Sequence, residues 1–133
     1  MMTAIVDSSA VIALFDEDAD EHSMVAAAIE RFDGPLVVSP FVVAELDYML
    51  AAKLGRRAVN KFNDDVALGA YELARWEVAD HAEALQVVRS FDGTEYIGVT
   101  DASNVVLADR YRTSVLMTLD QRHFRKLQHR RTH

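Results

Sequence analysis

The 133-residue chain contains no cysteine, so it can form no disulfide and offers neither a thiolate zinc site nor a cysteine nucleophile. It also lacks any apolar run near the roughly 20 residues that a membrane-spanning helix needs. Its start, MMTAIVD, has neither the basic segment nor the apolar segment of a signal peptide. We therefore expect a protein without a membrane segment that works in the cytoplasm.

Basic charge is scarce as well. The chain has 14 lysines and arginines against 21 aspartates and glutamates, a net charge of −7, which argues against a protein that binds nucleic acid with its whole surface. The segment after Asp120 is the exception, because it is basic throughout. There we expect Arg122 and Arg125, on a short helix over residues 121–127, either to be solvated or to contact a phosphate. Residues 129–133 are expected to form a disordered basic tail.

The pattern of apolar residues predicts the fold class. Short apolar runs, typical of buried strands, occur at residues 4–6, 36–38 and 114–118, with a weaker one at 71–76. Helical patterns separate them, after Asp7 and over residues 22–32, 41–54, 58–68, 79–91 and 99–111. This alternation predicts a single α/β domain over residues 1–128. Its central, mostly parallel sheet would have four to five strands, flanked by helices on both faces.

The stretch TAIVDSSAVIALF, residues 3–15, organises the rest of the chain. Its apolar run ends at Asp7 and turns directly into a helix at Ser8 and Ser9. One interpretation is that Asp7 only caps this helix, as short polar residues commonly do. The other is that its carboxylate stands at the carboxyl end of a central strand, where open α/β sheets place their sites.

Four carboxylates occupy equivalent positions. Asp7 and Asp120 each follow a strand, whereas Glu45 and Asp101 each lie near the start of a helix, Glu45 about 100° from the centre of its apolar stripe. In a parallel sheet, strand carboxyl ends and the amino ends of the following helices share one edge, so the four can converge. Their repulsion must then be offset, and a hard divalent cation with oxygen ligands does this. Because no histidine occupies these positions, magnesium or manganese is favoured over zinc.

Four segments carry a resemblance to a known family. TAIVDSSAVIALF, SPFVVAEL, VTDASNVVLAD and VLMTLDQRHF, in this order and spacing, closely resemble the PIN-domain ribonucleases, above all the VapC-type toxins of bacterial toxin–antitoxin pairs. The resemblance covers nearly the whole chain. It implies a magnesium- or manganese-dependent endoribonuclease that forms a homodimer and is inhibited by a small cognate antitoxin.

The resemblance also assigns roles to residues. It places the family's four catalytic and metal-binding acids on Asp7, Glu45, Asp101 and Asp120. It places the small polar residue after the first acid on Ser8 and the threonine before the last acid on Thr118. Asn104 stands one helical turn after Asp101 and would help these two to orient the ligands. The cation would activate a water for in-line attack on phosphorus, giving 5′-phosphate and 3′-hydroxyl products.

Two other classes of function stay open. A phosphatase or phosphotransferase with an aspartyl nucleophile also places an aspartate after its first strand. However, the haloacid-dehalogenase type needs a second acid where Ser9 stands, and a receiver domain needs a lysine where Asp120 stands. A non-catalytic binding module could share the PIN-like fold. Metal-dependent hydrolysis by the pure protein would separate that module from a nuclease.

Overall fold

The computed structural model describes residues 2–91 and 96–120. A four-stranded parallel sheet lies at its centre, in the order β3-β2-β1-β4. The strands are β1 (Ala4–Val6), β2 (Leu36–Val38), β3 (Glu72–Leu73) and β4 (Leu116–Met117). In the described residues the helices are α1 (Ser8–Phe15), α2 (His22–Arg31), α3 (Pro40–Leu54), α4 (Arg56–Ala67), α5 (Val78–Ser90) and α6 (Val99–Arg110). The α/β class and the parallel sheet expected from the sequence are confirmed.

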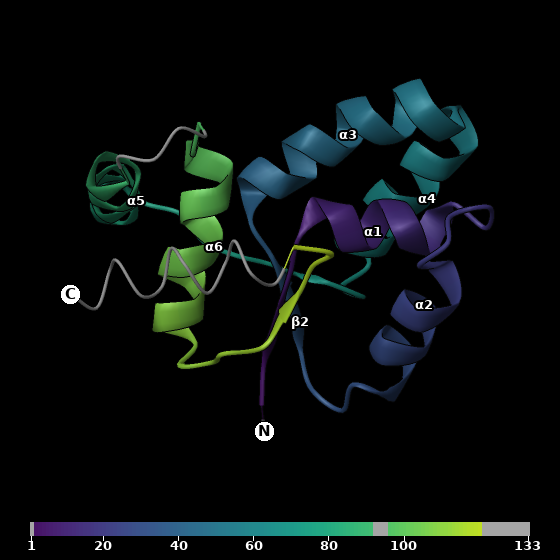
Figure 1. The fold of residues 1–133 in the computed structure, drawn as a ribbon, viewed down its shortest axis with the longest axis horizontal. Coiled ribbons are helices and arrows are strands. Elements are labelled where there is room, and N and C mark those ends of the chain that lie inside the picture. The colour runs from purple at the N-terminus through teal and green to yellow at the C-terminus, as the bar shows by residue number, and fades with distance from the viewer. Residues whose placement is uncertain (1, 92–95, 121–133) are drawn as a thin grey trace.

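Helices cover both faces of the sheet, and the strands alternate between two apolar cores. Ile5 and Val37 belong to the core that α5 and α6 complete, whereas Val6 and Val38 belong to the core under α1, α2, α3 and α4. Figure 1 shows α5 and α6 on one side of the sheet and the other four helices on the opposite side. The period-two alternation of a strand therefore explains why these short runs are apolar throughout.

Helix α3 has clear start and stop signals. The Ser39 hydroxyl accepts a hydrogen bond from the backbone N–H of Phe41, and Pro40 occupies the first turn. The helix ends at Gly55, whose φ of 97° lies in the left-handed region that favours glycine. Both ends agree with the sequence pattern, and they fix where Glu45 stands along the helix.

Packing against α6 sets which residues of α5 are buried. The buried residues of α5 are Ala84 and Val87, whereas Ala82 is exposed. The ring of His81, in the first turn of α5, packs against Trp76 and Phe41. The apolar spacing within one helix does not specify these contacts between elements.

Some expectations lie outside the described residues, namely the helix over 121–127, the tail over 129–133, and the side chains of Arg122 and Arg125. Among the residues that are described, no helix is long and apolar enough to cross a membrane.

Tyr71 gives the fold a pH dependence that can be measured. Its ring is 5% exposed and lies 5.6 Å from that of Phe62 between centroids. Burial, with a smaller contribution from Asp65, raises the pKa of the Tyr71 hydroxyl to about 12. An unfolded tyrosine ionises near pH 10, so the native state holds this proton more tightly than the unfolded state.

We predict that the stability contributed by neutral Tyr71 is fully present below about pH 10 and is lost as the pH rises through about 12. The Tyr71→Phe variant lacks this proton, so its free energy of unfolding should fall less steeply over that range. Urea unfolding of both proteins at several pH values gives the difference between their free energies of unfolding. The titration of the lysines is common to both proteins and cancels in this difference. Identical slopes would contradict the prediction.

Candidate functional site

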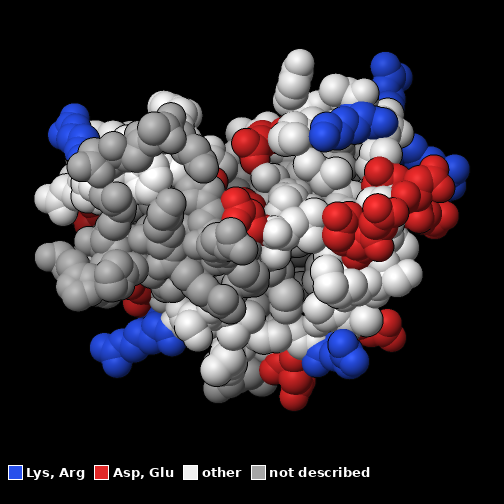
Figure 2. Space-filling model, viewed as in Figure 1, with Lys and Arg blue, Asp and Glu red and all other residues white. Residues whose placement is uncertain are grey.

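The carboxyl ends of the strands form one edge of the sheet, and polar residues gather there. Asp7 follows β1, Ser39 follows β2, and Thr118 follows β4. Helices α1, α3 and α6 begin at this edge (Figure 1). Figure 2 shows acidic side chains in the middle of the face where these helices begin, and a second acidic group over the turn at residues 16–21 between α1 and α2.

The carboxylate of Asp7 is held from both sides. Its Oδ1 accepts a hydrogen bond of 3.1 Å from Nδ2 of Asn104 on α6. Its Oδ2 accepts hydrogen bonds from Oγ1 of Thr118 at 3.0 Å and from Oγ of Ser9 at 3.4 Å. Asp7 does occupy the cap position of α1, but its side chain makes no capping hydrogen bond. The interpretation that Asp7 only caps the helix is therefore wrong.

Ser9 also ties the start of α1 to the segment that follows β4. Its Oγ lies 3.1 Å from Oγ1 of Thr118 and accepts the backbone N–H of Leu119 at 3.0 Å. The Thr118 oxygen in turn accepts the N–H of Asp120 at 3.1 Å. These bonds fix the backbone that carries Asp120 relative to Asp7.

Sequence reasoning named Ser8 and missed Ser9, and the role expected for Ser8 stays a prediction. The hydroxyl that reaches Asp7 belongs to Ser9, whereas Ser8 lines a neighbouring cavity with Glu45. Both serines follow the aspartate in the first turn of α1, so residue type alone does not separate them. The signal that could have found Ser9 is its position two residues after Asp7, the local spacing at which serine hydroxyls reach neighbouring polar groups.

Asn104 is nearly completely buried, at 3% exposure, and one half of its amide is satisfied by Asp7. Its Oδ1 is buried without a hydrogen-bond partner among the described residues. Asp101 lies one turn earlier on α6 and is half-buried. Because residues three apart share a helix face, Asp101 stands on the face of α6 that Asn104 turns toward Asp7.

Two buried hydroxyls join the helices that carry Glu45 and Asp101. Ser39 and Ser103 are both 0% exposed, and their Oγ atoms lie 2.7 Å apart. Ser103 donates to the carbonyl oxygen of Thr100 at 2.6 Å, so the proton between the two serines comes from Ser39. This pair fixes the start of α3 against the second turn of α6. Sequence reasoning missed it because nothing in the chain links positions 64 residues apart.

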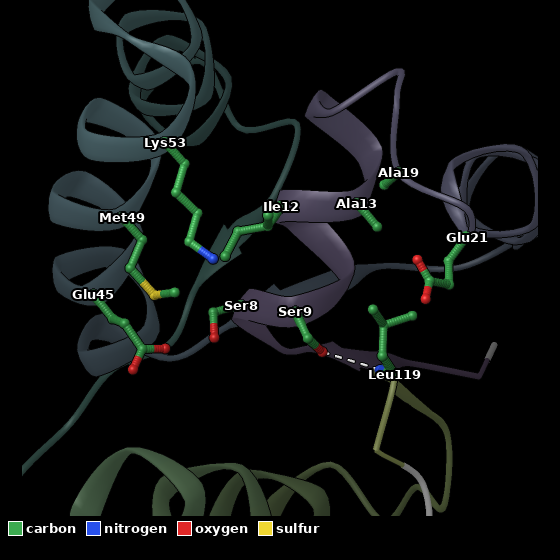
Figure 3. Close-up of a pocket in the computed structure, with 10 residues that line it drawn as sticks. All are labelled: Ser8, Ser9, Ile12, Ala13, Ala19, Glu21, Glu45, Met49, Lys53 and Leu119. Carbon is green, nitrogen blue, oxygen red and sulfur yellow. Dashed lines mark hydrogen bonds between the residues drawn. The ribbon is translucent and has the colours of Figure 1, made fainter.

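Glu45 opens onto a cavity of about 360 Å³ between α1 and α3. In Figure 3 the Glu45 carboxylate points from α3 toward Ser8, and Lys53, two turns further along α3, also extends toward α1. Ile12 and Met49 supply apolar surface between them. The cavity therefore has a polar end beside Glu45 and an apolar middle.

The described residues do not form a complete metal-binding site as they stand. Among residues 2–91 and 96–120, no group of three or more histidines, aspartates and glutamates is arranged to hold an ion. The structure brings Asn104, Thr118 and Ser9 onto Asp7, and it places Glu45, Asp101 and Asp120 on segments that reach the same edge. The convergence of all four carboxylates stays a prediction.

Comparison with known proteins gives three findings. The family model described as PIN domain matches residues 4–129. The protein named Ribonuclease VapC26 from Mycobacterium tuberculosis is 45% identical over 123 residues, which are 92% of this chain and 90% of that protein. The crystal structure of Mycobacterium tuberculosis VapC20, described as a sarcin–ricin loop cleaving toxin, matches with a TM-score of 0.81 over 88% of this chain and 89% of that one. Its sequence identity is 17%, so this likeness concerns the fold alone.

The two neighbouring serines provide a matched test of the hydrogen-bond network. Ser9→Ala removes the acceptor of the Leu119 N–H, so amide hydrogen exchange at residue 119 should accelerate, and the free energy of unfolding should fall by about 1 kcal/mol. Ser8→Ala is the control and should leave this exchange rate unchanged. The exchange rate at residue 119 is measured by NMR. Equal rates in the two variants would contradict the hydrogen bond from the Leu119 N–H to Ser9.

Proposed function

This chain belongs to the PIN-domain family, as the sequence resemblance indicated, and on that basis we propose that it is an endoribonuclease toxin of a toxin–antitoxin pair. Two observations support the proposal. A relative named as a ribonuclease is 45% identical over nearly the full length of both chains. The observation that carries the site is the Asp7 carboxylate, held by three neutral donors at the carboxyl end of a central strand.

The residues at this edge fit a hard divalent cation, magnesium or manganese. Within residues 2–91 and 96–120, the side chains that hydrogen-bond to Asp7 are an amide and two hydroxyls, and none of these donors carries a positive charge. The unpartnered, buried Oδ1 of Asn104 is a further oxygen acceptor beside it. We assign the cation to Asp7, Glu45, Asp101 and Asp120, whose oxygen atoms suit magnesium and manganese.

The chain's own groups then divide the work of phosphodiester hydrolysis. When bound, the cation supplies an activated water and charge stabilisation at the leaving oxygen. Asn104 and Thr118 keep the two oxygens of Asp7 in one orientation. The Ser39–Ser103 pair joins the helices that carry Glu45 and Asp101, and we assign both carboxylates to the cation beside the phosphate. Such outer contacts typically change metal affinity by about 10- to 100-fold when they are removed.

The first test uses the pure protein and RNA. We expect cleavage in magnesium or manganese, none in excess chelator, and none for the isosteric variant Asp7→Asn. Calorimetry should show weaker manganese binding for Asp7→Asn, and about 10- to 100-fold weaker binding for Thr118→Val. Asp64→Asn, which removes the same charge from exposed α4, is the matched control and should behave as the unchanged protein. Equal metal affinity in Asp7→Asn would count against the site.

We further propose that the protein acts in the cytoplasm as a homodimer restrained by a small antitoxin. The net charge of −7 and the acidic middle of the face in Figure 2 favour an inhibitor that inserts a basic side chain. Arginine is the best match, because its planar fork pairs with carboxylates.

Expression in a bacterial host tests this partnership. The protein alone should arrest growth, Asp7→Asn should not, and co-expression of the neighbouring open reading frame should restore growth. Sequencing of newly formed RNA 5′ ends after brief expression identifies the RNA that is cut. Normal growth while soluble, folded protein accumulates would contradict the proposal.

A further inference from the structure

Three aromatic side chains meet beside the catalytic edge. The ring of Trp76 lies 5.3 Å from that of Phe41 and 6.4 Å from that of His81, nearly perpendicular to both. The indole Nε1–H also donates to Nδ1 of His81 at 3.3 Å. These contacts fix the orientation of the Trp76 ring without fully burying it.

An open pocket of about 680 Å³ lies against this ring. It is lined by Trp76, Glu77, Val78, Ala79 and His81. Val78 is 87% exposed and adds apolar surface at the pocket. Because the pocket lies between the end of β3 and the start of α5, it opens at the same edge of the parallel sheet as Asp7.

Phe41 connects the pocket to the site. It lies in the first turn of α3, one helical turn before Glu45, so the two side chains are neighbours on the helix surface. Its ring contacts Trp76, and its backbone N–H is held by Ser39. An RNA strand with one phosphate near Glu45 would therefore run past the aromatic group of Phe41, Trp76 and His81.

The acidic groups beside the pocket are engaged in contacts at the start of α5. The carboxylate of Asp80 is occupied, since it accepts the backbone N–H of Glu77 at 2.8 Å and pairs with Arg110 at 2.9 Å. The Glu77 side chain completes the same capping box at the start of α5. Arg75, directly before Trp76, is exposed.

We propose that this pocket binds an unpaired nucleobase of the RNA substrate, stacked on Trp76, next to the phosphate that is cleaved. The assignment rests on the proposed ribonuclease function. Aromatic rings are a usual means by which proteins hold single-stranded RNA, because every base has a flat face that can stack. In an acidic protein such local contacts replace a basic surface.

The chain has a single tryptophan, so its fluorescence reports on this pocket directly. The Asp7→Asn protein, which does not cleave, is titrated with a short oligoadenylate and with an abasic ribose-phosphate oligomer of the same length and charge. The oligoadenylate should quench the fluorescence, and the abasic oligomer should not, with about 5- to 150-fold weaker binding. Equal quenching by both probes, or by neither, overturns the proposal.

Kinetics of the unmodified site give the second readout. Trp76→Ala should raise KM for RNA by about 5- to 150-fold with a much smaller change in kcat, and Trp76→Phe should restore most of the loss because it keeps a stacking face. Leu68→Ala is the matched control, since Leu68 is 85% exposed at the end of α4, away from the pocket. If Trp76→Ala does not fold, the comparison of the two oligomers still decides.

The outcomes separate this inference from the proposed function. RNA cleavage without base-dependent quenching would contradict base binding at the pocket but support the ribonuclease activity. Base-dependent quenching without any cleavage would support base binding but contradict the ribonuclease activity. Quenching by an apolar peptide but by neither oligomer would assign the pocket to a protein partner and overturn the proposal.

Discussion

The geometry of the site depends on how the Asp7 carboxylate is held. Donors from α6, from α1 and from the end of β4 converge on its two oxygens, although they are separated by up to 111 residues in the chain. The strand before it, Ala4–Val6, is completely buried and pairs with β2 and β4. A carboxylate at the end of a fixed central strand has little freedom to move. The helices α1 and α6 and the end of β4 are therefore all positioned relative to the charge of Asp7.

The sequence predicted the parts that follow from local patterns. The apolar runs, the helical spacing, and the Ser39-Pro40 and Gly55 signals of α3 each depend on neighbours within a few residues, and the structure agrees with them. The positions of Asp7, Glu45 and Asp120 follow from parallel topology, whereas α6, which carries Asp101, follows another helix and is not placed by that topology.

The sequence could not predict contacts made across the fold. The choice of Ser9 over Ser8, the buried Ser39–Ser103 pair and the packing of His81 on Trp76 all depend on which helices lie against each other. Serine and histidine are also ambiguous residue types, since each is common both at the surface and in buried hydrogen-bonded places. The family resemblance supplied the functional class and the acids, but not this supporting arrangement.

The neutral donors around Asp7 also show what sets the direction of its charge. Among the described residues, an amide and two hydroxyls hold the carboxylate, so the chain's own groups orient it in this structure. Small domains whose cores form only around zinc differ, because there the metal itself holds its ligands in place. Hydrogen bonds from neutral groups are also not pairs of opposite charges, so dissolved salt does not screen them as it screens ion pairs.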